Sequence, residues 1–122
     1  MHASAHQRPL LLEAGPAQVR GADWDGLRVG VVSVPAGTDF SPLLRGLPND
    51  LCGGAHWGYL IKGRLRVNYA DGTEETLTAG DFFHLPEGHT GLAEEATDFV
   101  EITNPAAHDQ FLENARRNLA AV

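Results

Sequence analysis

The chain has 122 residues, of which 43% are hydrophobic and 20% are charged, a balance typical of a folded globular protein and not of a disordered one. This length predicts a single domain spanning residues 1–122. The formal net charge of −7 argues against a nucleic-acid-binding protein, because neutralising phosphates requires clustered Lys and Arg side chains.

The only cysteine, Cys52, excludes an intramolecular disulfide and suits a reducing compartment. The first nine residues lack the basic and apolar segments of a secretory signal. No apolar run reaches the roughly 20 residues that span a bilayer. These features predict a cytoplasmic protein with no membrane partner.

The first half of the chain combines short strands with a long loop. Residues 1–9 are expected to form a loose arm, and residues 10–13 a short edge strand before a Gly-Pro break. Residues 27–34 are rich in β-branched side chains and predict another strand. From 38 to 54 the residues Pro, Gly, Asn and Asp recur densely, which indicates a loop long enough to suggest a functional role.

The second half reads as consecutive short strands followed by one helix. Alternating side chains and tight turns, among them the hairpin signal Asp71-Gly72, predict strands at 56–62, 64–69, 74–78, 82–85, 88–93 and 98–103. After a break at Pro105, apolar residues recur at helical spacing from 109 to 121, with Asp109 as a candidate cap. The pattern predicts an all-β barrel over about 10–105 and a short C-terminal helix over about 109–121.

The stretch from 50 to 101 resembles the cupin superfamily. Gly80, followed after five residues by Pro86-Glu87-Gly88, matches the second cupin motif, and Gly63 matches the glycine that ends the first. The resemblance implies a small single-domain cupin, whose fold is a double-stranded β-helix or jelly-roll barrel. Because cupins carry out many different reactions, this fold does not by itself select a function.

The usual cupin metal ligands are not reproduced. In the first motif, Asp50 and Cys52 stand at the two histidine positions and His56 stands at the glutamate position. In the second motif, the last histidine position holds Gly91, while His89 stands two residues earlier. The chain looks more like a subset of small cupin-domain proteins that carry His-x-Gly-Tyr in the first motif and Pro-x-Gly-His in the second.

Cys52, His56 and His89 form the candidate metal site. Side chains two or four apart in a strand share a face, so Cys52 and His56 point the same way if the strand extends back to the cysteine. The resemblance implies that the side chain at position 91 points into the barrel, and His89, two residues earlier in the same strand, points the same way. One thiolate and two imidazoles favour Zn²⁺, with Fe or Ni as alternatives. The competing interpretations are a buried apolar cysteine, a core histidine and a solvated loop histidine.

Glu101 and His84 are the candidate proton-transfer residues. Glu101 lies in an otherwise apolar strand, where a carboxylate needs a partner, so it is either a salt-bridge member or an interior acid or base. His84 faces either the interior or the outer surface of the barrel. Arg64 and Arg66 alternate with apolar residues and form a solvated face, unless they turn inward and bind a carboxylate ligand.

The remaining histidines and the exposed aromatic residues suggest no separate site. His2, His6 and His108 are expected to be exposed. Trp57 and Tyr59 lie opposite His56 in parity and are expected to pack between sheets or at a dimer interface. Because a barrel with open ends gains from dimerisation, we expect a homodimer.

Two functions of different classes follow from these predictions. The leading hypothesis is a metal-dependent cupin enzyme of lyase, isomerase or hydrolytic type that acts on a small organic metabolite bound in the barrel. The alternative is a non-catalytic cupin, a sensor or a small-molecule-binding module, with an apolar metal-free interior in which Cys52 packs. A third hypothesis is a structural dimer whose pocket is vestigial.

Overall fold

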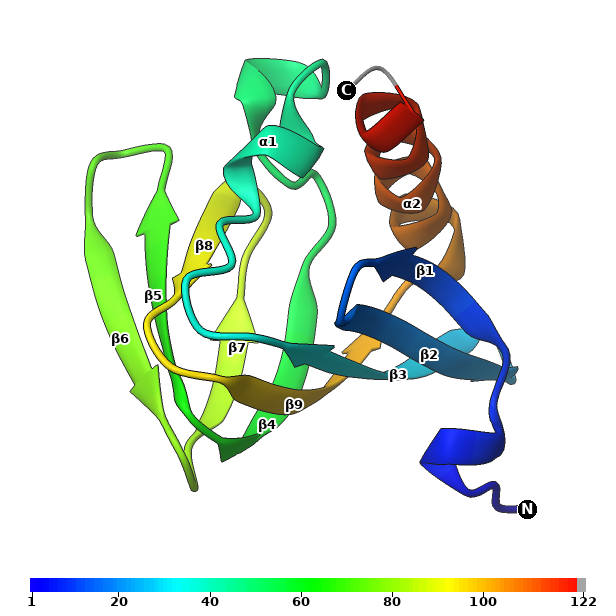
Figure 1. The fold of residues 1–122 in the computed structure, drawn as a ribbon. Coiled ribbons are helices and arrows are strands. Elements are labelled where there is room, and N and C mark those ends of the chain that lie inside the picture. The colour runs from blue at the N-terminus through cyan, green and yellow to red at the C-terminus, as the bar shows by residue number, and fades with distance from the viewer. Residues whose placement is uncertain (121–122) are drawn as a thin grey trace.

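The computed structural model describes residues 1–120, whose strands form two antiparallel sheets around a common core (Figure 1). The larger sheet has the strand order β1-β2-β3-β9-β4-β7, and the smaller sheet has the order β6-β5-β8. The strands are β1 (Leu10–Ala14), β2 (Ala17–Trp24), β3 (Leu27–Val34), β4 (His56–Lys62), β5 (Arg64–Tyr69), β6 (Glu74–Thr78), β7 (Phe82–Leu85), β8 (His89–Ala93) and β9 (Thr97–Thr103). The helices are α1 (Ser41–Leu44) and α2 (Pro105–Ala120), with 3-10 turns at Ala5–Gln7 and Pro48–Asp50.

Each predicted strand is confirmed to within one residue at either end, but β2 was not predicted. Its sequence, AQVRGADW, contains Gly, Gln and Asp residues that rarely favour a strand. The strand forms because residues 17–20 pair with β1 on one side and residues 18–24 pair with β3 on the other. Tertiary pairing therefore overrides a weak local preference.

Helix α2 begins at Pro105, so the predicted start at 109 was wrong. The side chain of Asn104 accepts hydrogen bonds from the backbone N–H groups of Ala106 at 2.9 Å and Ala107 at 3.3 Å, which makes Asn104 the helix cap. Proline suits the first helical position, where its missing N–H leaves no bond unmade. Asp109, the predicted cap, lies inside the helix, and the last predicted helical residue, 121, lies outside the described residues.

The loop predicted between 38 and 54 folds over one end of the sheets and is held there by α2 (Figure 1). The Asn114 side-chain amide donates to the carbonyls of Leu43 and Arg45, at 2.9 Å each. Asn118 donates to the same Arg45 carbonyl at 2.8 Å. The loop and the helix are thus joined to each other and together cover this end of the sheets.

Within residues 1–120, neither helix is long and apolar enough to cross a membrane.

Candidate metal centre

Three separate segments bring Cys52, His56 and His89 together. His56 begins β4 and His89 begins β8, while Cys52 lies in the loop before β4. An isolated β-bridge fixes that loop against β8: the Cys52 N–H donates to the His89 carbonyl at 2.9 Å, and the Gly88 N–H donates to the Cys52 carbonyl at 2.7 Å. The bridge gives the cysteine a strand-like position although no regular strand reaches it.

The ligand atoms of these three residues lie within 4.8 Å of one another. The sulfur of Cys52 is 3.4 Å from Nε2 of His56, and the rings of His56 and His89 meet edge to face with centroids 5.1 Å apart. Each of the three residues is only 7% exposed. The predicted grouping of these residues is therefore present in the fold, inside the barrel and away from bulk water.

Hydrogen bonding leaves Nε2 of His89 free. Its Nδ1 lies 2.7 Å from the Pro86 carbonyl, which can only accept, so Nδ1 carries the proton and donates it. The unprotonated Nε2 then has a lone pair available to a ligand. A second-shell carbonyl that fixes the tautomer in this way is typical of metal-binding histidines.

The carboxylate of Glu101 sets the tautomer of the His56 ring. Its Nδ1 lies 3.4 Å from Oε2 of Glu101, yet it makes no aligned hydrogen bond and is one of two buried polar side-chain atoms without a partner in residues 1–120. A carboxylate at this distance favours a proton on Nδ1. The lone pair of His56 is then on Nε2, the atom that faces Cys52.

A chain of contacts continues from Glu101 to the C-terminal helix. The guanidinium of Arg28 lies 3.1 Å from Nδ1 of His108, and because arginine only donates, Nδ1 must accept. The Nε2–H of His108 therefore donates to Oε1 of Glu101, 3.2 Å away. The prediction that His108 is exposed was wrong, since its exposed fraction is 3%.

The sequence contains a pattern that could have predicted the burial of His108. With the helix beginning at Pro105, His108 falls on the same apolar stripe as Phe111, Leu112 and Ala115, at helical spacing. The later predicted start left it outside the helix. The partner Arg28 carries no such signal, because it stands on the inward face of β3 among apolar residues.

Burial determines the protonation states at the site. It lowers the pKa of His89 to about 4, and it lowers the pKa of His56 against the opposing effect of the Glu101 carboxylate. It also raises the pKa of the Cys52 thiol. Burial alone would raise the pKa of Glu101, but the hydrogen bond from His108 outweighs it, so the pKa of Glu101 is lowered. Metal binding requires neutral imidazoles, which burial favours here, and a thiolate, which a bound metal would have to stabilise against the effect of burial.

His84, in contrast, does not join the cluster. It is exposed on the outer surface of β7 and stacks on Trp57, with ring centroids 4.9 Å apart. Of the two orientations predicted for His84, the structure therefore shows the one that faces the outer surface of the barrel. Arg64 also faces outward, where it pairs with Glu95 at 2.8 Å, and Arg66 lies 3.9 Å from Glu94.

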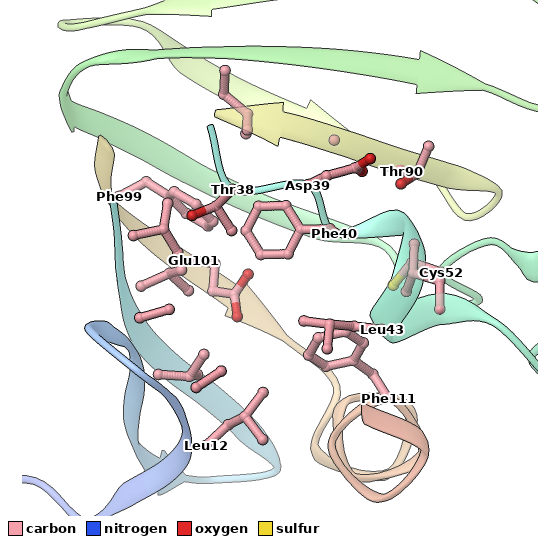
Figure 2. Close-up of a pocket in the computed structure, with 18 of the residues that line it drawn as sticks. Leu12, Thr38, Asp39, Phe40, Leu43, Cys52, Thr90, Phe99, Glu101 and Phe111 are labelled. Carbon is pink, nitrogen blue, oxygen red and sulfur yellow. The ribbon is translucent and has the colours of Figure 1, made fainter. Parts of the chain in front are cut away.

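The cluster forms part of the wall of a cavity of about 340 Å³. Figure 2 shows the Glu101 carboxylate directed into this space, with Phe40, Leu43 and Phe111 around it. Apolar side chains from β1, β2, β3, β5 and β9 also line the cavity. The volume falls at the lower end of that usual for small-molecule sites, roughly 300–1,000 Å³.

The donor set fits a metal ion. One cysteine sulfur and two imidazole nitrogens form a set that Zn²⁺ uses in tetrahedral catalytic sites, with the fourth position open. The unpartnered Nδ1 of His56 and the carboxylate beside it match the outer-shell arrangement of such sites. The buried cluster could therefore hold a metal ion.

No protein-family model and no curated protein sequence matches the chain. Among solved structures, it is similar to an RmlC-like cupin from Shewanella frigidimarina, with a TM-score of 0.63 and 18% identity over 88% of this chain and 93% of that one. The fold is that of the cupins. The predicted all-β jelly-roll barrel with a C-terminal helix is thereby confirmed.

Two enzymes share the cupin fold of this chain. Ectoine synthase from P. lautus has a TM-score of 0.59 and 18% identity, over 81% of this chain and 75% of that one. Oxalate decarboxylase from Bacillus subtilis, described with Mn(II) centres, has a TM-score of 0.65 and 20% identity, over 84% of this chain but 28% of that one. At these identities the likeness concerns the fold alone.

Proposed function

We propose that this chain is a small metal-dependent cupin enzyme that acts on an organic metabolite bound in its barrel. The observation that carries the proposal is the position of the three ligand atoms, within 4.8 Å of one another on the wall of a cavity. Sites that combine a mostly apolar pocket with a few convergent polar groups are the usual places of ligand binding and catalysis. A structural neighbour that is described with Mn(II) centres, oxalate decarboxylase, also supports the proposal.

Zinc suits the donor set best, with iron or nickel as alternatives, because a thiolate with two imidazoles is a combination of soft and borderline ligands. Cys52 would supply the thiolate, and His56 and His89 would supply their Nε2 atoms. When bound, the metal would act as a Lewis acid or lower the pKa of a bound water. This chemistry fits a lyase, an isomerase or a hydrolytic enzyme. A cysteine ligand that must stay reduced also fits the expected cytoplasmic location.

Glu101 is the residue we propose for proton transfer. It is ionised, it is buried, and its carboxylate is directed into the cavity (Figure 2). Its two oxygens face His56 and His108, so the carboxylate is held in one orientation. A positioned carboxylate of this kind can take a proton from a bound ligand.

The metal site is tested by single alanine variants. His56→Ala and His89→Ala should each reduce the metal content of untagged, dialysed protein from about one ion per chain to nearly none, while the barrel stays folded. His84→Ala is the matched control, because this histidine is exposed and distant from the cavity. Metal retained in both site variants, or lost equally in the control, would refute the site.

A non-catalytic binding module is the second candidate, favoured by the largely apolar walls of the cavity. The two functions are separated by incubating the metal-loaded protein with a metabolite extract and following the components by mass spectrometry. An enzyme depletes at least one metabolite and forms a product, and Glu101→Gln does neither. A metabolite that is retained by the protein but unchanged would indicate a binding module.

We further propose that two copies of the chain pair through the outer face of the larger sheet. There, four neighbouring strands present apolar side chains outward: Leu27, Val29, Val31, Trp57, Tyr59, Ile61, Phe82, Val100 and Ile102. Phe82 is 87% exposed and Trp57 is 52% exposed, so they do not pack between the sheets. A continuous apolar face is typical of an interaction surface, and two identical faces complement each other across a twofold axis.

A further inference from the structure

The titratable side chains in the cavity wall are Asp39, Cys52, Glu101 and three histidines, His56, His89 and His108. Within residues 1–120, neither Lys nor Arg lines it. Arg28 is buried nearby, but its guanidinium is held by Asp23 and Asp109 at 2.7 Å each. An anionic ligand in this cavity would therefore find no lysine or arginine side chain to pair with.

The charges at the candidate metal centre also balance. The two positive charges of a divalent ion would be offset by one negative charge on the Cys52 thiolate and one on the Glu101 carboxylate, 3.4 Å behind His56. Asp39, which is exposed where it lines the cavity, adds a further negative charge. A bound divalent ion would therefore offer an anion no net positive charge.

A cationic ligand is disfavoured for a different reason. Both oxygens of Glu101 already face imidazoles, at 3.4 Å from His56 and 3.2 Å from His108. The cavity wall around it includes apolar side chains such as Val32, Val67 and Phe99. Moving an unpaired ammonium or carboxylate from water into such surroundings is strongly unfavourable.

From the cavity wall and the charge balance, we infer that the site takes an uncharged, largely apolar molecule with one polar end directed at Cys52, His56 and His89. This inference rests on the proposed function, since it names the ligand class for the same cavity. The apolar part would pack against the aliphatic and aromatic walls, and the polar end would reach the buried cluster of Cys52, His56 and His89. A small carboxylate such as oxalate does not fit this description.

The inference is tested with three probes of similar size: hexanamide, hexanoate and hexylamine, the last two charged at neutral pH. Their binding is measured by titration calorimetry to metal-free and to zinc-treated protein. Hexanamide should bind more tightly than either charged probe, by about tenfold or more. Shortening it stepwise to propanamide should weaken binding roughly fourfold for each methylene removed. Equal or tighter binding of a charged probe, or no binding of hexanamide, would overturn the inference.

Two variants locate the binding. Val32 lines the cavity, whereas Val31, the next residue in β3, faces the opposite side of the sheet. Val32→Phe should abolish hexanamide binding by filling the cavity, and Val31→Phe should leave it unchanged. If Val32→Phe does not fold, the comparison of the three probes on the unaltered protein still decides the matter.

Failure of the proposed function and failure of this inference give different results. A protein that retains no zinc but prefers hexanamide in its metal-free form contradicts the metal centre and keeps the ligand class. A protein that retains zinc and prefers hexanoate keeps the metal centre and contradicts the ligand class.

Discussion

At the scale of single residues, Arg28 influences the candidate metal centre without reaching it. Because its guanidinium can only donate, it fixes the tautomer of His108, which donates in turn to Glu101. The other oxygen of Glu101 faces Nδ1 of His56. Glu101 therefore orients His56, while His108 and Arg28 hold Glu101 in place and act as positioning residues.

Replacing His108 tests this arrangement. His108→Leu should weaken metal binding about 10- to 100-fold, since outer-shell partners of metal-binding histidines have effects of that size. His108→Gln keeps one donor and one acceptor and should restore most of the affinity. Competition with a chelator of known zinc affinity measures both variants. If His108→Gln is as impaired as His108→Leu, the histidine acts through packing alone.

The proximity of Cys52, His56 and His89 could be predicted from the sequence, because strand parity and the cupin motif positions place these side chains on inward faces. The role of His108 could not, since it depends on where α2 begins and on a pairing with Arg28, which lies 80 residues away in the chain. Contacts of such long range leave no local pattern. The orientation of Glu101 could not be predicted for the same reason, because its partners come from the distant elements β4 and α2.

At the scale of elements, strands β4, β7 and β9 approach one another at Gly58. A Cβ atom at this position would lie 2.0 Å from the carbonyl oxygen of Val100 and 2.4 Å from a ring carbon of Phe83. No side chain fits there without moving the backbone. The glycine therefore sets the spacing of the sheet that holds His56, two residues earlier on the same strand and the same face.

The variant Gly58→Ala should destabilise the protein by about 3 kcal/mol or more, because overpacking displaces backbone here and not only flexible side chains. It should also lower metal binding by moving His56. Gly53→Ala is the control: a Cβ there meets no atom within 4 Å, so its effect should stay below about 1 kcal/mol. Urea denaturation measures both, and an unaffected Gly58→Ala would contradict the close approach.

The strands of the barrel could be predicted because alternation and Gly-containing turns are local signals. Strand β2 and the start of α2 could not be predicted in the same way. In β2, polar residues mask the alternation, and pairing on both edges stabilises the strand. At Pro105, the same residue type either ends or begins a helix, and only the Asn104 cap decides which.

At the scale of the whole molecule, the two faces of the larger sheet differ in what they contact. Its inner face contributes residues to the cavity and the candidate metal centre. Its outer face, with Trp57, Tyr59 and Phe82, presents apolar side chains to solvent. Antiparallel sheets with one solvated face usually carry polar residues there, so the apolar outer face supports the proposed pairing of two copies.

We expect Phe82→Asp to convert a dimer into a monomer, because a charge would be buried without a partner in the paired face. Light scattering after size-exclusion chromatography measures the mass. Leu10→Asp is the matched control, since Leu10 is also exposed but lies on β1, at the far edge of the sheet. A monomeric unaltered protein, or a dimeric Phe82→Asp variant, would show that the face does not pair.

The central claim, that Cys52, His56 and His89 together hold one metal ion, is tested most directly by X-ray absorption spectroscopy of the zinc-loaded protein. The account predicts one sulfur ligand at about 2.3 Å and two imidazole nitrogens at about 2.0–2.1 Å, with the sulfur signal lost in Cys52→Ser. A zinc ion surrounded only by nitrogen and oxygen in the unaltered protein would contradict it.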